Sequence, residues 1–197
     1  MSTDNNRSLN YIEIPKLFYN DLTGAPMQKC ISCERDLLDG IEPYMIEKAL
    51  KPYDGLRSYS TVFEYAMCMQ CMEGYQSKIS KESMAKINDH FAANIDIENR
   101  RGLIENNQFD DLDAWVNKCI ITKTEVESTA ECQIYAQCIG DQLIMADYPY
   151  MISGIAMEEI VKLLSPETLD EFGRLQEELI GPSEFQDLLK GGPKVFL

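Results

Sequence analysis

The sequence predicts an α+β protein in which two similar units follow one another. Three observations lead to this prediction. Two CxxC pairs, Cys30/Cys33 and Cys68/Cys71, lie 34 residues apart. Between them are two apolar runs typical of strands, and a helical pattern follows the second pair. The second half of the chain repeats this outline and some of its residues, which indicates a repeated structural unit.

The chain has 197 residues, of which 45% are hydrophobic and 26% are charged. These fractions are ordinary for a globular protein, and the length is sufficient for two small domains. We therefore expect five parts along the chain: an N-terminal segment (1–22), a first unit (23–95), a linker (96–113), a second unit (114–180) and a C-terminal tail (181–197).

The formal net charge is −15, and no run of basic residues is longer than Arg100 and Arg101. Such a surface repels a phosphate backbone, so nucleic-acid binding is not expected. Residues 1–10 lack the apolar core of a secretory signal, and no apolar stretch is long enough to span a bilayer. Seven cysteines, an odd number, indicate reduced thiols. We expect a cytoplasmic protein with no membrane contact.

The first unit is predicted as a knuckle, a hairpin and then helices. Residues 11–19 form the first apolar cluster, and a turn at 23–26 leads to the first CxxC pair. Apolar runs at 44–50 and 61–67 predict two strands. Turn residues at 52–55 between these runs predict that the strands pair as an antiparallel hairpin.

Two helices are predicted after the hairpin. Met72, Tyr75 and Ile79 recur with helical spacing, which places Cys71 near a helix start. The positive end of a helix dipole favours thiolate over thiol, which suits a metal ligand. A second helix is expected to begin at Ser80 and to carry Met84, Ile87 and Phe91 on one face.

The four paired cysteines predict a metal site. Each CxxC bends the backbone so that both sulfurs can face one ion, and four thiolates complete a tetrahedron. No position is left for a substrate or an activating water, so the site is expected to be structural. We predict one Zn²⁺ per chain, held by Cys30, Cys33, Cys68 and Cys71. Iron is the less favoured alternative, because thiolate sites accept both metals.

The order knuckle, hairpin, helix, with ligand pairs in the knuckle and the first turn of the helix, resembles the treble-clef zinc domain. The resemblance covers about residues 26–80 and implies the same four cysteine ligands. Treble clefs occur in ribosomal, nuclease, ubiquitin-linked and purely structural proteins. The resemblance therefore predicts a metal and leaves the function open.

The second half of the chain can be aligned with the first. Cys30 lies over Cys119 at an offset of 89 residues, and Met72 lies over Met157 at an offset of 85. Chance similarity is the alternative explanation. In the second copy, residues 122, 153 and 156 are Thr, Ser and Ala where the first copy has cysteines. One thiolate cannot hold zinc, so a core is expected in its place, filled by Tyr148, Tyr150, Met151, Ile152 and Ile155.

Other elements of the second unit follow from local signals. Residues 132–139 predict a strand whose even spacing places Cys132 and Cys138 on one face, about 20 Å apart at roughly 3.3 Å per residue. They are too far apart to share a metal, and buried apolar thiols are expected. Ser165 and Pro166 predict the start of a helix that ends before Gly181.

No catalytic constellation is present in the sequence. The one histidine, His90, lies far from the cysteine pairs and is expected to be an ordinary helix residue. We therefore expect a non-catalytic, zinc-stabilised protein that binds another protein, with a redox sensor based on the CxxC thiols as the alternative. The tail at 181–197 ends in Val195, Phe196 and Leu197 and is expected to dock on its own domain or on a partner.

Overall fold

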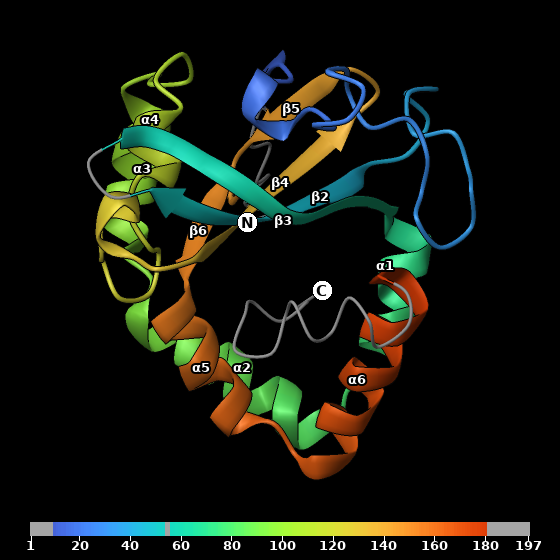
Figure 1. The fold of residues 1–197 in the computed structure, drawn as a ribbon. Coiled ribbons are helices and arrows are strands. Elements are labelled where there is room, and N and C mark those ends of the chain that lie inside the picture. The colour runs from blue at the N-terminus through green and yellow to red at the C-terminus, as the bar shows by residue number, and fades with distance from the viewer. Residues whose placement is uncertain (1–9, 54–55, 181–197) are drawn as a thin grey trace, which may run out of the picture.

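A computed structural model describes residues 10–53 and 56–180 of the chain. Figure 1 shows one twisted sheet with helices α1, α2, α5 and α6 below it, and with α3 and α4 beside one end. Segregation of helices to one face of an antiparallel sheet is typical of α+β folds. The described residues form a mixed α+β structure with a six-stranded antiparallel sheet and six α-helices, which confirms the predicted fold class at this level.

The strands are β1 (Asn10–Glu13), β2 (Tyr44–Tyr53), β3 (Leu56–Cys68), β4 (Cys132–Ile139), β5 (Gln142–Met145) and β6 (Tyr150–Ser153). The helices are α1 (Met69–Gln76), α2 (Lys81–Asn94), α3 (Ile97–Glu105), α4 (Asp113–Val116), α5 (Gly154–Leu163) and α6 (Pro166–Ile180). Two single 3₁₀ turns, Lys16–Phe18 and Val126–Ser128, complete the described elements. None of the described helices combines the length and the apolar character that a membrane span requires.

The sheet joins strands from both halves of the chain. The strand order is β1-β5-β4-β2-β3, and β6 pairs with β4 outside this path. β2 and β3 form the predicted hairpin, with Tyr44 opposite Cys68. β2 also pairs with β4, with Tyr44 opposite Cys138. Both faces of this central pair are covered, and most of its side chains are buried. Residues 54 and 55 of the predicted turn lie outside the described residues.

The predicted helix starts at Ser80 and Ser165 are confirmed. Each serine hydroxyl accepts a hydrogen bond from the backbone N–H three residues later, at Ser83 and Thr168. Hydrogen bonds also join the N-terminal ends of α2 and α6. The Ser80 N–H donates to Thr168 Oγ1 at 3.1 Å, and the Ser165 N–H donates to Ser83 Oγ at 2.8 Å. Because such caps satisfy otherwise unpaired N–H groups, α2 and α6 are fixed against one another at their starts.

The segment predicted as a linker contains a helix. Residues 97–105 form α3, and the Arg100 guanidinium lies 4.6 Å from the centre of the Trp115 ring. Arg100 also donates to the backbone oxygens of Asp147 and Pro149, just before β6. α3 is therefore tied to the second half of the chain, while the division into domains stays a prediction.

Two loops 89 residues apart share a backbone pattern. The Cys30 N–H donates to the Arg35 oxygen at 2.9 Å, and the Cys119 N–H donates to the Thr124 oxygen at 2.8 Å. Isolated β-bridges close both loops, Lys29 with Asp36 in the first and Lys118 with Glu125 in the second. Each loop thus presents its cysteine from the same kind of tight turn.

Candidate metal centre

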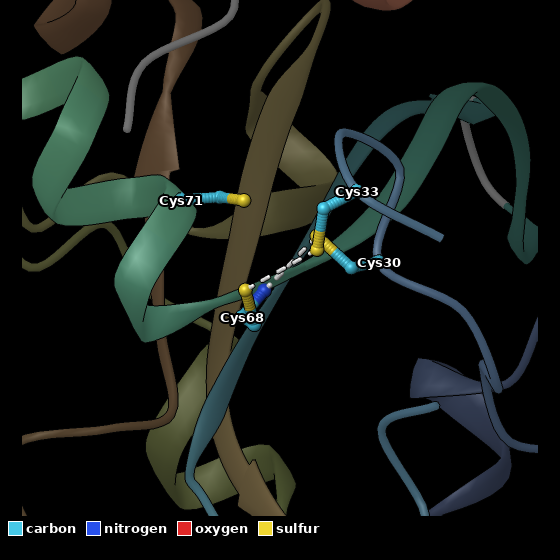
Figure 2. A group of neighbouring side chains, drawn as sticks. All are labelled: Cys30, Cys33, Cys68 and Cys71. Atoms are coloured by element: carbon cyan, nitrogen blue, oxygen red, sulfur yellow. Dashed lines mark hydrogen bonds between the residues drawn. The ribbon is translucent and has the colours of Figure 1, made fainter. Parts of the chain in front are cut away.

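The four predicted ligands come from two parts of the chain. Cys30 and Cys33 lie in the bridged loop before β2, while Cys68 ends β3 and Cys71 is the third residue of α1. Figure 2 shows the loop cysteines on one side and Cys68 and Cys71 on the other, with their sulfurs close together. Cys68 is the N-cap of α1, so the extended strand turns into a helix between the last two cysteines.

The distances between the sulfurs fit a tetrahedral metal ion. All four Sγ atoms lie within 4.8 Å of one another. The Sγ atoms of Cys33 and Cys68 are 3.8 Å apart. Metal–sulfur bonds of about 2.3 Å in a tetrahedron place the sulfurs about 3.8 Å apart. The cluster is therefore of the right size for zinc, and the same donor set is compatible with iron.

Contacts outside the sulfurs hold the loop against β3 and α1. The Ile31 N–H donates to the Ala66 oxygen at 2.9 Å. The Arg35 guanidinium donates to Gln70 Oε1 on α1 at 2.9 Å. The Cys68 N–H points at Cys30 Sγ at 3.4 Å, a hydrogen bond that favours the thiolate. The positions of the sulfurs are thus supported by the protein frame itself.

The pKa values of two thiols in this cluster are shifted in opposite directions, down for Cys30 and up for Cys71. Burial raises the pKa of the Cys30 thiol. Hydrogen bonds from backbone amides, led by that of Cys68, lower this pKa by a larger amount, so that the net pKa is about 7. Burial raises the pKa of the Cys71 thiol to about 12, and the neighbouring sulfurs add to the rise. Four thiolates this close repel each other unless a cation lies between them. A divalent metal ion removes that repulsion and deprotonates all four.

One side of the cluster faces the core and the other faces solvent. Cys30 and Cys68 are buried, Cys71 is half-buried and Cys33 is exposed. The exposed guanidinium of Arg35 lies nearby, and its pKa is raised by Glu42 and, to a smaller extent, by the Cys68 and Cys33 thiols. This cation partly offsets the negative charge that four thiolates carry.

Comparisons with protein-family models, with curated proteins and with solved structures gave no match.

The loop around Cys119 holds a hydrogen-bonded cluster of a different kind. The backbone N–H groups of Thr122 and Ser153 both donate to Cys119 Sγ at 3.3 Å. The hydroxyls of Thr122 and Ser153 are 3.1 Å apart. Of the predicted apolar filling, Met151 lies beside Cys119, whereas Ile155 is 61% exposed, and Tyr148, Tyr150 and Ile152 line a cavity whose walls do not include Cys119. α5 begins at Gly154 and turns Ile155 outward, so hydroxyl groups lie beside the cysteine.

The remaining cysteines lie where they were predicted. Cys132 and Cys138 are buried in β4, and burial raises the pKa of each thiol to about 12. Within residues 10–53 and 56–180, neither joins Cys119 in a group that could hold a metal. His90 lies near the end of α2 and is absent from the four-cysteine cluster. The buried thiols of β4 are therefore packing residues.

A second polar cluster, which was not predicted from the sequence, lies on the sheet. The Glu47 side chain is 2% exposed, although its strand is mostly apolar. The hydroxyls of Tyr65 and Tyr135 both donate to its carboxyl group. An acidic residue within an apolar strand run was the signal that could have found this cluster, because buried carboxyl groups require partners.

Proposed function

We propose that this chain is a non-catalytic protein that is held together by one structural zinc ion and that acts by binding another protein. The observation that carries the zinc assignment is the convergence of four sulfur atoms within 4.8 Å from two segments of the chain. Four thiolates fill the coordination shell of zinc, so the ion has no position for a substrate or a reactive water.

The metal assignment is tested on the purified protein. Elemental mass spectrometry is expected to give one zinc per chain, and a thiol titration is expected to gain four reactive groups after a chelator is added. Replacement of zinc by cobalt should give the visible absorption of tetrahedral cobalt–thiolate. A stoichiometric amount of iron would identify the bound metal as iron instead of zinc. The absence of bound metal would refute the metal assignment.

The protein-binding role is supported by the edge of the sheet. β3 is the last strand of the sheet path, and the side chains of Tyr59 and Val62 on it are exposed. Edge strands present unpaired backbone groups on which a partner segment can add a further strand. The hairpin that carries this edge ends directly in Cys68, so the metal centre would fix its position.

This role is tested with a photo-crosslinking amino acid at position 59. A discrete crosslinked partner is expected in a lysate of the source cells, and Val62→Lys should weaken it. The same crosslinker at position 11, on the opposite edge strand, serves as the control. Equal products from both positions, or products insensitive to Val62→Lys, would contradict the assignment of β3 as the docking edge.

We also propose that residues 26–80 form a treble-clef-like unit and that the second half is a metal-free version of it. Support comes from the matching loop bridges and from Glu34 and Lys123, which adopt positive φ angles of 60° and 62° at equivalent places. Further support comes from the loops' contacts: the Ile31 N–H donates to the Ala66 oxygen, and the Ile120 N–H donates to the Met151 oxygen. The two pairs differ by the same offsets of 89 and 85 residues.

A redox sensor is the second candidate function, and the exposure of Cys33 favours it. Oxidation of an exposed zinc-bound thiolate breaks the coordination shell and releases the ion. Zinc release on addition of dilute hydrogen peroxide, measured with a zinc indicator and reversed by a thiol reductant, would support this role. Retention of zinc under the same conditions would rule out the sensor role, and the structural role would remain.

A further inference from the structure

A cavity of about 430 Å³ lies between the sheet and the helices that Figure 1 shows below it. Its described lining is mainly apolar and includes Met72 of α1, Met84 and Phe91 of α2, Met157 of α5 and Phe172 of α6. None of the four paired cysteines lines it, so the cavity is separate from the metal centre. Apolar walls of this kind favour an apolar occupant, because its contact with them removes apolar surface from water.

A smaller cavity extends this region along α6. Its volume is about 130 Å³, and it is lined by Tyr75 of α1 and Leu175 of α6, among others. It shares Ile79 and Phe172 with the larger cavity. The two cavities therefore border the same side chains, and together they follow α6 from Phe172 toward the C-terminal end of that helix.

The C-terminal tail, residues 181–197, follows α6 directly and lies outside the described residues. It begins with Gly181 and Pro182, a pair that ends a helix and lets the chain change direction. Phe172 lies eight residues before the end of α6, a distance of about 12 Å at 1.5 Å per residue. The five residues from 181 to 185 can span about 16 Å at roughly 3.3 Å per residue. Phe185 can therefore reach back to the cavity.

The sequence of the tail suits an apolar surface. Phe185, Leu188 and Leu189 have the spacing i, i+3, i+4, which is the pattern of a segment that presents one apolar face. Burial of phenylalanine and leucine side chains is among the larger favourable contributions that single residues make. Methionines, which line the cavity on three helices, adapt their side chains to the shape of such a partner.

The charge of the tail differs from that of the rest of the chain. Residues 181–197 contain two acidic residues, Glu184 and Asp187, and two basic residues, Lys190 and Lys194. The formal net charge of −15 therefore belongs to residues 1–180. A second copy of such an acidic body is repelled, whereas a segment without net charge is not.

The attachment of the tail to α6 also favours it over a separate molecule. A segment joined to its site by a short connection has an effective concentration on the order of millimolar there. A partner in solution would have to compete with that concentration. Reach, apolar spacing, charge and attachment thus all point to the same occupant.

We propose that residues 185–189 of the tail bind in this cavity within the same chain, with Phe185, Leu188 and Leu189 against its apolar walls. The bound segment contacts both halves of the chain, because Met72 and Met84 belong to the first half and Met157 belongs to the second. An apolar ligand or a partner segment can then enter the cavity only by displacing the chain's own tail.

The place of binding is tested with a benzophenone-bearing phenylalanine at position 185 of the 197-residue chain. Irradiation is expected to join this position to Met72, Met84 or Met157, and mass spectrometry of the peptides locates the bond. The same amino acid at position 22, where Leu22 is exposed and outside the cavity, is the control and should join none of the three. Bonds from position 185 to other residues only, or no bond at all, would overturn the proposal.

A mixture of isotope-labelled and unlabelled protein distinguishes binding within one chain from exchange between two copies. After irradiation, both peptides of each crosslinked pair are expected to carry the same label. Pairs that combine labelled and unlabelled peptides in the statistical proportion would show that the tail enters a second copy, and they would overturn binding in cis.

A matched pair of double variants tests the apolar contacts. Phe185→Ser with Leu188→Ser should lower Tm by about 4 °C or more, because apolar burial at the cavity is lost. Ser183→Ala with Asp187→Asn changes polar positions of the same tail and should leave Tm unchanged. Equal effects of the two double variants would overturn the proposal.

Methionines labelled at the methyl carbon report on the same variants by NMR. Phe185→Ser with Leu188→Ser should shift the signals of Met72, Met84 and Met157, which line the cavity. The signal of Met151, which is buried elsewhere, should stay in place. Unchanged signals for all three cavity methionines would show that the tail does not bind there.

Discussion

The loops around Cys30 and Cys119 share a backbone arrangement, but different side chains surround the two cysteines. In both, a bridged turn presents a buried cysteine to the residue that caps a helix: the Cys68 N–H points at Cys30 Sγ, and the Ser153 N–H points at Cys119 Sγ. Around Cys30 three further sulfurs complete a metal-sized cluster. Around Cys119 the hydroxyls of Thr122 and Ser153 contact each other.

The bridged turn and the capped helix start therefore form around Cys119 without a set of four metal-binding sulfurs. A hydrogen bond contributes about 1 kcal/mol to stability, while structural zinc contributes on the order of 10 kcal/mol in small zinc domains. The two sites occupy similar places in the sheet, because Cys68 ends β3, which pairs with β2, and Ser153 ends β6, which pairs with β4.

The largest effect is expected from loss of a ligand in the first cluster. Cys68→Ser or Cys71→Ser should release zinc and lower Tm by about 15 °C or more, because each kcal/mol corresponds to about 2–4 °C in a chain of this length. Calorimetric unfolding and metal analysis of both variants check this. Unchanged unfolding curves for both variants would remove the structural role of the centre.

The proposed equivalence of the two halves predicts a second metal site when cysteines replace three residues near Cys119. With Cys119, the substitutions Thr122→Cys, Ser153→Cys and Ala156→Cys give a set of four cysteines. Positions 153 and 156 are the N-cap and the third residue of α5, as positions 68 and 71 are in α1. Zinc content should rise from one to two per chain, with a rise in Tm of several degrees.

The control for this triple variant is the same chain with Cys119→Ser added, which should return the zinc content to one. If the triple variant still binds one zinc, the two loops are not equivalent in the sense proposed, and the comparison between the halves fails.

A smaller effect is expected from Ser153→Ala. Its hydroxyl accepts from the Ala156 N–H at 3.4 Å and contacts the Thr122 hydroxyl at 3.1 Å. Loss of both contacts should reduce the free energy of unfolding by about 1–2 kcal/mol with one zinc retained. Urea unfolding measures this, and Ser58→Ala on the exposed surface is the control, with an expected change within about 0.5 kcal/mol. Equal effects of the two substitutions would contradict a role for the hydroxyl cluster.

The smallest effect is expected from Cys119→Ser. Serine keeps an acceptor for the two N–H groups, so zinc content should stay at one and stability should fall by about 1 kcal/mol or less. Loss of zinc from this variant would mean that Cys119 takes part in the metal site.

Local signals explain what the sequence predicted well. The hairpin of β2 and β3, the caps at Ser80 and Ser165 and the buried strand β4 each depend on residues close together in the chain. The bend within each CxxC pair is local in the same way. In these cases neighbouring residues determine the geometry, so periodicity and capping preferences are sufficient.

Contacts between distant segments explain what the sequence did not predict. The pairing of β2 with β4 joins the two halves in one sheet, and no local pattern indicates which strands become neighbours. The row that places Glu47 between Tyr65 and Tyr135 is a product of that pairing. Arg100 was assigned to a linker, because its contacts with Trp115 and Pro149 depend on packing between separate segments.

We propose that one closed centre of four sulfurs, from Cys30, Cys33, Cys68 and Cys71, holds a zinc ion. X-ray absorption at the zinc edge of the purified protein tests it most directly, because it reports the number, type and distance of the donor atoms. The expected result is four sulfurs at about 2.3 Å and no nitrogen or oxygen donor. A shell with two or three sulfurs and lighter donors would contradict it, since the metal would then have an open position or ligands from outside the four-cysteine cluster.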